Sequence, residues 1–167
     1  MQIALLSSVE DCTANQALYA DLLRYPETYQ YFLSPELRHT LFSGDVVFSL
    51  IAIGYPDGWI ETIDSEYHRV ILPFGAAYAQ SPAVRVYRPS QVDDGQTDAL
   101  FGVSLEDIPT QTPIEFSNRG RHGYLRRSSG AYGSVIEYSA PSDQFAANAE
   151  LLHRMATTTW NADPPEN

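Results

Sequence analysis

An amphipathic stretch near the end of the sequence constrains the fold more than any other feature. Between Ser142 and Trp160 apolar residues recur at the spacing of one side of a helix. We expect Ser142 to cap this helix and Asp143 to stabilise its first turn. The residues on the apolar side are Phe145, Ala149, Leu152, Met155 and Ala156. A helix with one apolar side must pack that side against a sheet or another helix.

Most of the chain before this helix has the character of short strands. A turn at Pro56-Asp57-Gly58 separates two of them, because proline fixes φ and glycine accepts the left-handed conformation. In the run from Ala83 to Tyr87, valine alternates with Arg85 and Tyr87, so the two kinds of side chain face opposite ways. The predicted strands are Gln2–Leu6, Val46–Ile53, Trp59–Ile63, Tyr67–Phe74, Ala83–Tyr87, Ile114–Ser117, Gly123–Arg127 and Ser134–Ser139.

These elements predict an α/β (α+β) fold: an α/β/α sandwich with a central, mostly antiparallel sheet and a C-terminal amphipathic helix. We expect residues 46–160 to form this sandwich. We expect residues 1–45 to be a helical extension packed on it, with helices at Thr13–Arg24 and Ser34–Gly44. Residues 161–167 are expected to be a flexible tail. Ser90–Leu100 is predicted to be an acidic loop and Ser104–Ile108 a single helical turn.

The charge of the chain disfavours several classes of partner. The formal net charge is −11, and all ten basic residues are arginine. Nucleic acid and anionic membrane surfaces are therefore poor partners, because both bind clustered cations. The absence of lysine rules out Schiff-base chemistry on this chain. No stretch has the ~18 apolar residues of a transmembrane segment.

Several segments resemble a known superfamily. Tyr55-Pro56-Asp57-Gly58-Trp59 fits an aromatic-Pro-x-Gly-Trp element between early strands, and Ser104-Leu105-Glu106-Asp107 fits the start of a mid-chain helix. Gly123-Tyr124 with Val135 to Tyr138 is similar to the late strands, and Phe145 to Trp160 to the closing helix. From about Val46 to Trp160 the chain thus resembles the superfamily of PsbP, Mog1 and DcrB.

The resemblance implies a sandwich around an antiparallel sheet and a binding or accessory role. On this basis we expect a non-enzymatic protein that docks on a protein partner, as in an envelope or photosystem-type assembly. The resemblance also favours a periplasmic or other extracytoplasmic location, although no signal peptide is visible in the sequence. We expect no cofactor.

A basic cluster is the best candidate for partner binding. Four of the ten arginines lie within nine positions, and guanidinium groups bind carboxylates and phosphates through two parallel hydrogen bonds. The predicted docking residues are Arg119, Arg121, His122, Tyr124, Arg126 and Arg127. Neutralisation of the protein's own acids is the alternative role for this cluster.

An acidic hairpin is the alternative functional site. Glu61, Asp64, Glu66 and His68 surround a predicted turn, and carboxylates beside an imidazole suit a divalent metal ion or an acid–base pair. The sequence therefore leaves open a small-molecule or metal-binding enzyme. A third possibility is an immunity-type inhibitor, in which the acidic charge speeds association with a basic toxin.

Overall fold

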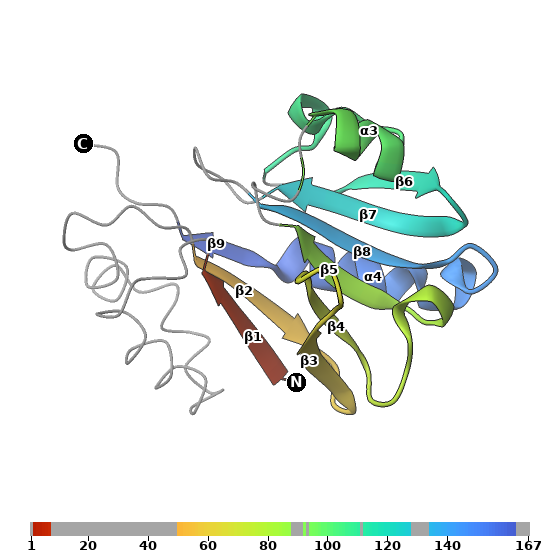
Figure 1. The fold of residues 1–167 in the computed structure, drawn as a ribbon. Helices are drawn as coiled ribbons and strands as arrows, with labels where there is room; N and C mark the ends of the chain where they lie inside the picture. Colours follow the sequence, from red (N-terminus) through yellow and green to blue (C-terminus); the bar gives the residue numbers. More distant parts are fainter. Residues whose placement is uncertain are drawn as a thin grey trace.

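A six-stranded antiparallel sheet is the centre of the fold (Figure 1). The computed structural model describes residues 2–7, 50–87, 92, 94–110, 112–127 and 134–162. The strand order is β3-β4-β5-β8-β7-β6. The strands are β3 (Trp59–Ile63), β4 (Arg69–Pro73), β5 (Ala83–Tyr87), β6 (Ile114–Asn118), β7 (Arg121–Arg127) and β8 (Val135–Pro141). Every pairing is antiparallel, which confirms the predicted α+β class.

A second, three-stranded sheet joins segments from both ends of the chain. Its central strand is β2 (Leu50–Tyr55), which pairs with β1 (Gln2–Ser7) on one edge and β9 (Trp160–Ala162) on the other. Residues 161 and 162 were expected in the flexible tail, but here they extend the sheet. The reason lies at Thr159, whose extended backbone (φ −60°, ψ 129°) ends the preceding helix and continues into β9.

Helix α4 (Phe145–Thr158) covers one face of the six-stranded sheet, which we call the α4 face (Figure 1). Leu152, Met155 and Ala156 of the predicted stripe are buried there. The helix begins two residues later than predicted, with Gln144 in place of Ser142 as its N-cap. Residues 142–144 form a turn instead, closed by a hydrogen bond from the Gln144 amide to the Pro141 carbonyl at 2.8 Å.

Shorter elements cover part of the opposite face, which we call the pocket face. Helix α3 (Asp94–Phe101) and the 3-10 turn η4 (Leu105–Asp107) pack on an apolar cluster that includes Phe101 and Phe116. The 3-10 turn η2 (Tyr78–Gln80) packs on a separate apolar cluster of β4 and β5. The acidic stretch predicted as a loop is therefore helical from Asp94 onward.

Tight turns and one close strand contact shape this sheet. Gly58 has the left-handed φ of 87° that the Pro-Asp-Gly turn predicts. The turn between β6 and β7 has positive φ at both central residues, 53° at Arg119 and 78° at Gly120. Beside it, β7 and β8 approach closely at Gly123, where an added Cβ atom would lie 2.1 Å from the Tyr138 carbonyl oxygen.

Some predictions fall outside the described residues. The predicted helices at Thr13–Arg24 and Ser34–Gly44 are among them, as is the start of the strand predicted at Val46. Among the helices that the structure describes, none has both the length and the apolar character needed to cross a bilayer.

Candidate functional site

A buried glutamate lies at the centre of the pocket face. Glu137 of β8 is 1% exposed, although its neighbours along the strand are apolar and aromatic. Its Oε2 accepts hydrogen bonds from the hydroxyls of Tyr78 (2.5 Å) and Ser139, and its Oε1 accepts one from Tyr87 (2.7 Å). The Arg121 Nε lies 3.4 Å from Oε2. All of these neighbours are donors, which is the environment of an ionised carboxylate.

Arg121 fixes the glutamate to the surrounding backbone. Its guanidinium donates to the carbonyls of Tyr78 (2.6 Å), Ser81 (3.0 Å) and Ser139 (3.0 Å), and its Nε donates to the Ser139 hydroxyl (2.8 Å). It also lies over the Tyr78 ring, 4.0 Å from the ring centroid. Arg121 therefore joins η2 to β8, and each of its three side-chain nitrogens donates within the protein.

Arg85 links this centre to the acidic hairpin between β3 and β4. Its guanidinium donates to Asp64 Oδ2 (2.6 and 3.0 Å), to Glu66 (3.2 Å) and to the Tyr87 hydroxyl (3.2 Å). A further contact of 3.1 Å joins it to His68 Nδ1. Arg85 therefore sits between the hairpin acids and the tyrosine that binds Glu137.

The charges around Arg85 shift two pKa values. Burial, followed by the nearby Arg85 charge, lowers the pKa of His68 below its ordinary value of 6.5. For Asp64, burial alone would raise the pKa, but hydrogen bonds from the His68 amide and Arg85 outweigh it and lower the pKa. At neutral pH the hairpin therefore presents an ionised aspartate and a neutral histidine to Arg85.

The structure divides the predicted metal-site residues. Asp64, Glu66 and His68 surround Arg85, so a guanidinium occupies the position between them. Glu61 lies on the opposite face of the hairpin and pairs with Arg69 at 2.7 Å. Within the described part of the chain, no group of three or more potential metal-ligating residues is close enough to hold an ion.

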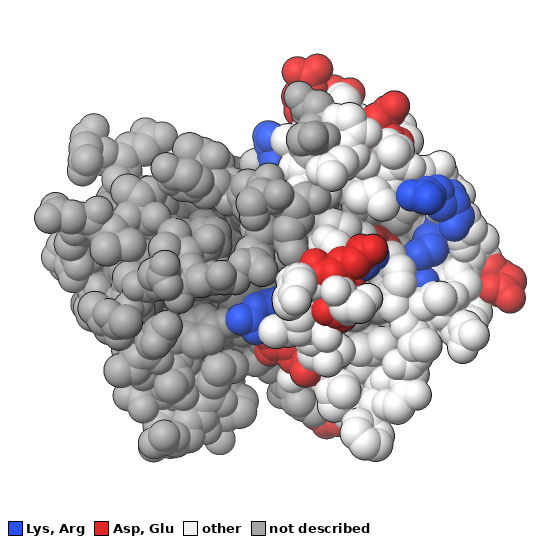
Figure 2. Space-filling model, viewed as in Figure 1, with Lys and Arg blue, Asp and Glu red and all other residues white. Residues whose placement is uncertain are grey.

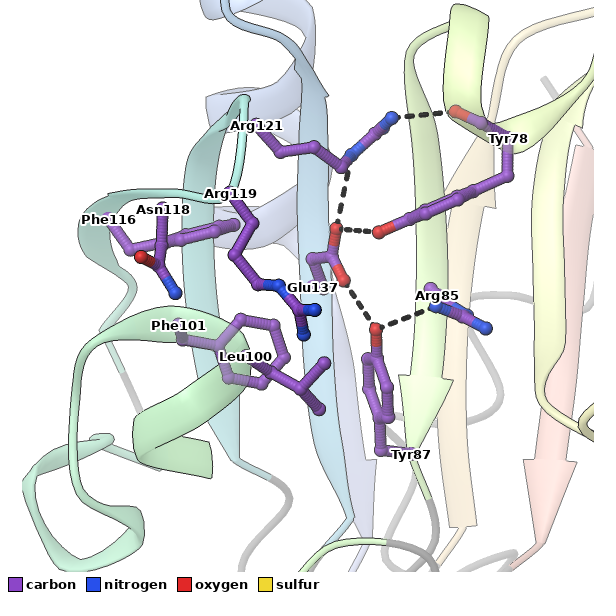
Figure 3. A pocket seen from close by; sticks show the side chains of 10 residues that line it. All are labelled: Tyr78, Arg85, Tyr87, Leu100, Phe101, Phe116, Asn118, Arg119, Arg121 and Glu137. Atoms are coloured by element: carbon purple, nitrogen blue, oxygen red, sulfur yellow. Dashed lines mark hydrogen bonds and ion pairs between the residues drawn. The ribbon is translucent and has the colours of Figure 1, made fainter. Parts of the chain in front are cut away.

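A pocket opens above Glu137 between α3, the β6–β7 turn and β5 (Figure 3). Its volume is about 180 Å³. Leu100, Phe101 and Phe116 form an apolar wall on one side, and polar and charged side chains form the rest. The lining residues are Tyr78, Arg85, Tyr87, Leu100, Phe101, Phe116, Asn118, Arg119, Arg121 and Glu137.

Arg119 differs from the other two arginines of the pocket. It lies in the β6–β7 turn, and Figure 3 shows its guanidinium extending into the pocket toward Glu137 without a hydrogen bond or ion pair to the other residues drawn. Among the described residues, no hydrogen bond or ion pair engages its side chain. Figure 2 shows one group of basic side chains on the side of the described surface away from the grey part, with further basic side chains elsewhere and acidic side chains scattered over this view. A cation is thus available in the pocket of a strongly acidic chain.

Both pocket tyrosines are held protonated. Burial, with the added effect of the Glu137 charge, raises the pKa of Tyr78 and of Tyr87 far above the ordinary value of 10.0. Each hydroxyl proton is directed at the glutamate. The tyrosines therefore serve as fixed donors at neutral pH.

Strand alternation divides the predicted docking cluster between two faces. Arg121 and Arg127 lie on the pocket face, whereas His122 and Arg126 lie on the α4 face. Arg126 is 5% exposed and is thus not available for a surface contact, contrary to our expectation. Its guanidinium donates to the carbonyls of Ala156 (2.7 Å), Thr159 (3.0 Å) and Thr110 (2.9 Å). Arg126 therefore caps the carboxyl end of α4.

The other two cluster members on the α4 face pack against the helix. The His122 ring stacks on Phe145 with centroids 3.6 Å apart, and its Nε2 lies 2.6 Å from a Glu115 carboxylate oxygen. Tyr124 contacts Phe145 and, edge to face, His153. Of the predicted docking residues, Arg119 is exposed and Arg127 is half-buried.

Sequence reasoning missed the residues at the centre of the site. Glu137, Tyr78 and Arg85 were not predicted as functional. One signal was present: a charged residue interrupts the apolar run Val135-Ile136-Glu137-Tyr138. A charge inside such a run is rarely buried without a partner, so it indicates a polar network within the fold.

Comparisons with protein-family models, with curated proteins and with solved structures give no match to this chain.

Proposed function

We propose that this chain is a non-enzymatic binding protein and that its pocket recognises an anionic group of the ligand. The observation that carries this proposal is the Arg119 guanidinium, which no described residue engages by a hydrogen bond or ion pair, in a pocket lined by two further arginines. Guanidinium groups are strong, directional ligands of carboxylates and phosphates. In a chain of net charge −11, such a concentration of cations in one concave site supports recognition of an anion.

The fixed roles of the pocket residues favour binding over catalysis. Glu137 accepts three hydroxyl donors, and the raised pKa values keep Tyr78 and Tyr87 protonated at neutral pH. A general acid or base works best when its pKa lies near the working pH. Groups held in one protonation state are better suited to shape and orient a site than to transfer protons.

The anionic group has two possible sources. A protein partner, the kind of ligand that we expect from the sequence, presents it on an aspartate or glutamate side chain. A free organic acid presents the same group in solution. Both would place their charge at Arg119, so the two sources share one site and differ in what surrounds the acid.

Titration of the full chain with defined anions tests the proposal. We expect acetate, benzoate, benzenesulfonate or an acetylated glutamate-rich peptide to give saturable changes in NMR signals of the pocket residues. Arg119→Ala should abolish these changes. Arg154→Ala is the matched control, because it removes the same charge from an exposed site on α4. Tighter binding of the peptide than of the small acids would identify a protein as the source.

Two results would overturn the proposed function. One is the absence of saturable binding by every anion, and the other is binding that Arg119→Ala and Arg154→Ala weaken equally. Either result would show that Arg119 has no ligand of this kind.

A further inference from the structure

We infer that the pocket selects a singly charged acid, above all a monocarboxylate, attached to a flat apolar body, and that it discriminates against doubly charged groups. This inference rests on the proposed function and names the class of ligand for the same site. Three features support it: the charge balance of the lining, its unused donors and its apolar wall.

The charge balance leaves one positive charge for a ligand. Arg85 faces two carboxylates, those of Asp64 at 2.6 Å and Glu66 at 3.2 Å. Arg121 lies 3.4 Å from the Glu137 carboxylate. Arg119 alone among the pocket arginines lacks an acidic partner within the described residues. One negative charge on a ligand is therefore compensated, whereas a second would lie uncompensated near Glu137, and like charges in close contact are strongly unfavourable.

The unused donors suit a group with two oxygens. The planar guanidinium of Arg119 offers two parallel N–H groups, which match the two oxygens of a carboxylate. The hydroxyl protons of Tyr78 and Tyr87 are already donated to Glu137. The side-chain amide of Asn118 donates to the Ala99 carbonyl at 3.0 Å.

The apolar wall determines the shape of the rest of the ligand. Phe101 and Phe116 meet edge to face with centroids 5.4 Å apart, and Phe101 meets Tyr87 in the same way at 5.4 Å. Leu100 completes this side of the pocket. The volume of about 180 Å³ equals that of roughly six water molecules at ~30 Å³ each. A single ring fits this space, whereas drug-sized ligands occupy pockets of roughly 300–1,000 Å³.

A set of matched probes tests the selection for one charge and the apolar contact on the unmodified full chain. Benzenesulfonate and phenylphosphonate share a ring and a head group with three oxygens. At a pH high enough to ionise phenylphosphonate fully, the two differ by one negative charge. We expect benzenesulfonate to bind at least about tenfold more tightly. Benzoate and acetate share a carboxylate and differ by the ring, and we expect benzoate to bind at least about tenfold more tightly. Isothermal titration calorimetry measures all four affinities.

A pair of leucine variants locates the apolar contact. Leu100→Ser should weaken benzoate and leave acetate unchanged, because only the ring contacts this side chain. Leu151→Ser is the control, since Leu151 is a half-buried leucine packed on the other side of the sheet. It should change neither affinity.

The outcomes separate this inference from the proposed function. Equal or tighter binding of phenylphosphonate, with Arg119 still required, would overturn the selection for one charge while the anion site itself stands. Equal binding of acetate and benzoate would overturn the apolar contact. If no probe binds in a way that requires Arg119, the proposed function is overturned and, with it, this inference.

Discussion

Arg119 combines an unfavourable backbone conformation with a side chain that makes no hydrogen bond or ion pair to the described residues. Its φ of 53° lies in the left-handed region, which glycine and asparagine enter far more readily than arginine. The next residue, Gly120, also has positive φ, as both central residues of a type I′ turn must. A residue that holds such a conformation beside a pocket is a candidate for function, because the local fold would be more stable with a different residue there.

Replacing Arg119 with asparagine should therefore separate stability from binding. Asn-Gly is the favoured pair for this turn, so we expect Arg119→Asn to raise the free energy of unfolding by about 1 kcal/mol. The same change should abolish anion binding, because the guanidinium is lost. Urea denaturation measures the first effect and calorimetric titration the second.

Arg119→Ala is the control for this prediction. Alanine keeps the unfavourable positive φ, so this variant should lose binding without gaining stability. A gain in stability equal to that of the asparagine variant would show that the side chain, and not the backbone, is the unfavourable part.

At the scale of the elements, the alternation of side chains along a strand was predictable from the sequence. Which element packs on each face of the strand was not. The opposite orientation of Arg85 and Tyr87 relative to the neighbouring valines is confirmed. A run of cations in β7 was interpreted as one exposed group. In the structure, α4 covers one side of that strand and buries Arg126, since carbonyl groups at the helix end accept its hydrogen bonds. No local pattern in the sequence shows which strand will lie beneath a helix end.

Helix α3 was missed for a related reason. Its first residues, Asp94 and Gly95, are typical of turns, and the stretch has few apolar residues. Its buried positions are Thr97 and Phe101, one helical turn apart. Only contact with Phe116 and its neighbours makes that short pattern sufficient for a helix.

Replacing Arg126 tests the connection between β7 and α4. Arg126→Met keeps much of the volume but removes three hydrogen bonds to carbonyl groups, and we expect a loss of about 2 kcal/mol in the free energy of unfolding. Amide exchange at Thr159, whose N–H donates to Met155, should become faster. Arg154→Met, on the exposed side of α4, should change neither quantity. Unchanged exchange at Thr159 would contradict the capping role.

The whole molecule couples the acidic hairpin to the pocket through Arg85. The acidic hairpin lies at one edge of the sheet, and Glu137 lies on a central strand. Arg85 of β5 binds the acids of the hairpin and also the hydroxyl of Tyr87, and Tyr87 in turn donates a hydrogen bond to Glu137. These residues come from segments far apart in the sequence. The fold class was predictable from the strands and the closing helix, but this convergence depends on strand order, which the sequence did not reveal.

This coupling predicts a two-step dependence of stability on pH. The pKa of His68 is lower in the folded state than its ordinary 6.5, so the unfolded chain binds more protons and stability falls as the pH drops through about 6.5. The pKa of Asp64 is lower than its ordinary 3.8, so the stability it contributes is present above 3.8 and is lost as the pH falls through the lower, folded value. Urea denaturation at a series of pH values measures both steps.

His68→Asn should remove the first step and leave the second, because the amide oxygen of asparagine can replace Nδ1 as the acceptor facing Arg85. His153→Asn is the control, since His153 is an exposed histidine of α4 whose ring contact is with Tyr124, on the opposite face of the sheet from Arg85. If the first step persists in His68→Asn, another group causes it.

The close approach of β7 to β8 at Gly123 has a consequence for genetics. Every other amino acid carries a Cβ atom, and here that atom would meet the backbone of the neighbouring strand at 2.1 Å. In a library that varies every codon, this position should therefore tolerate only glycine, whatever property is under selection. The depletion of Gly123 variants from the selected library then marks the level that corresponds to complete loss of folding. Variants at pocket positions that are depleted less than this can be recognised as defective in binding.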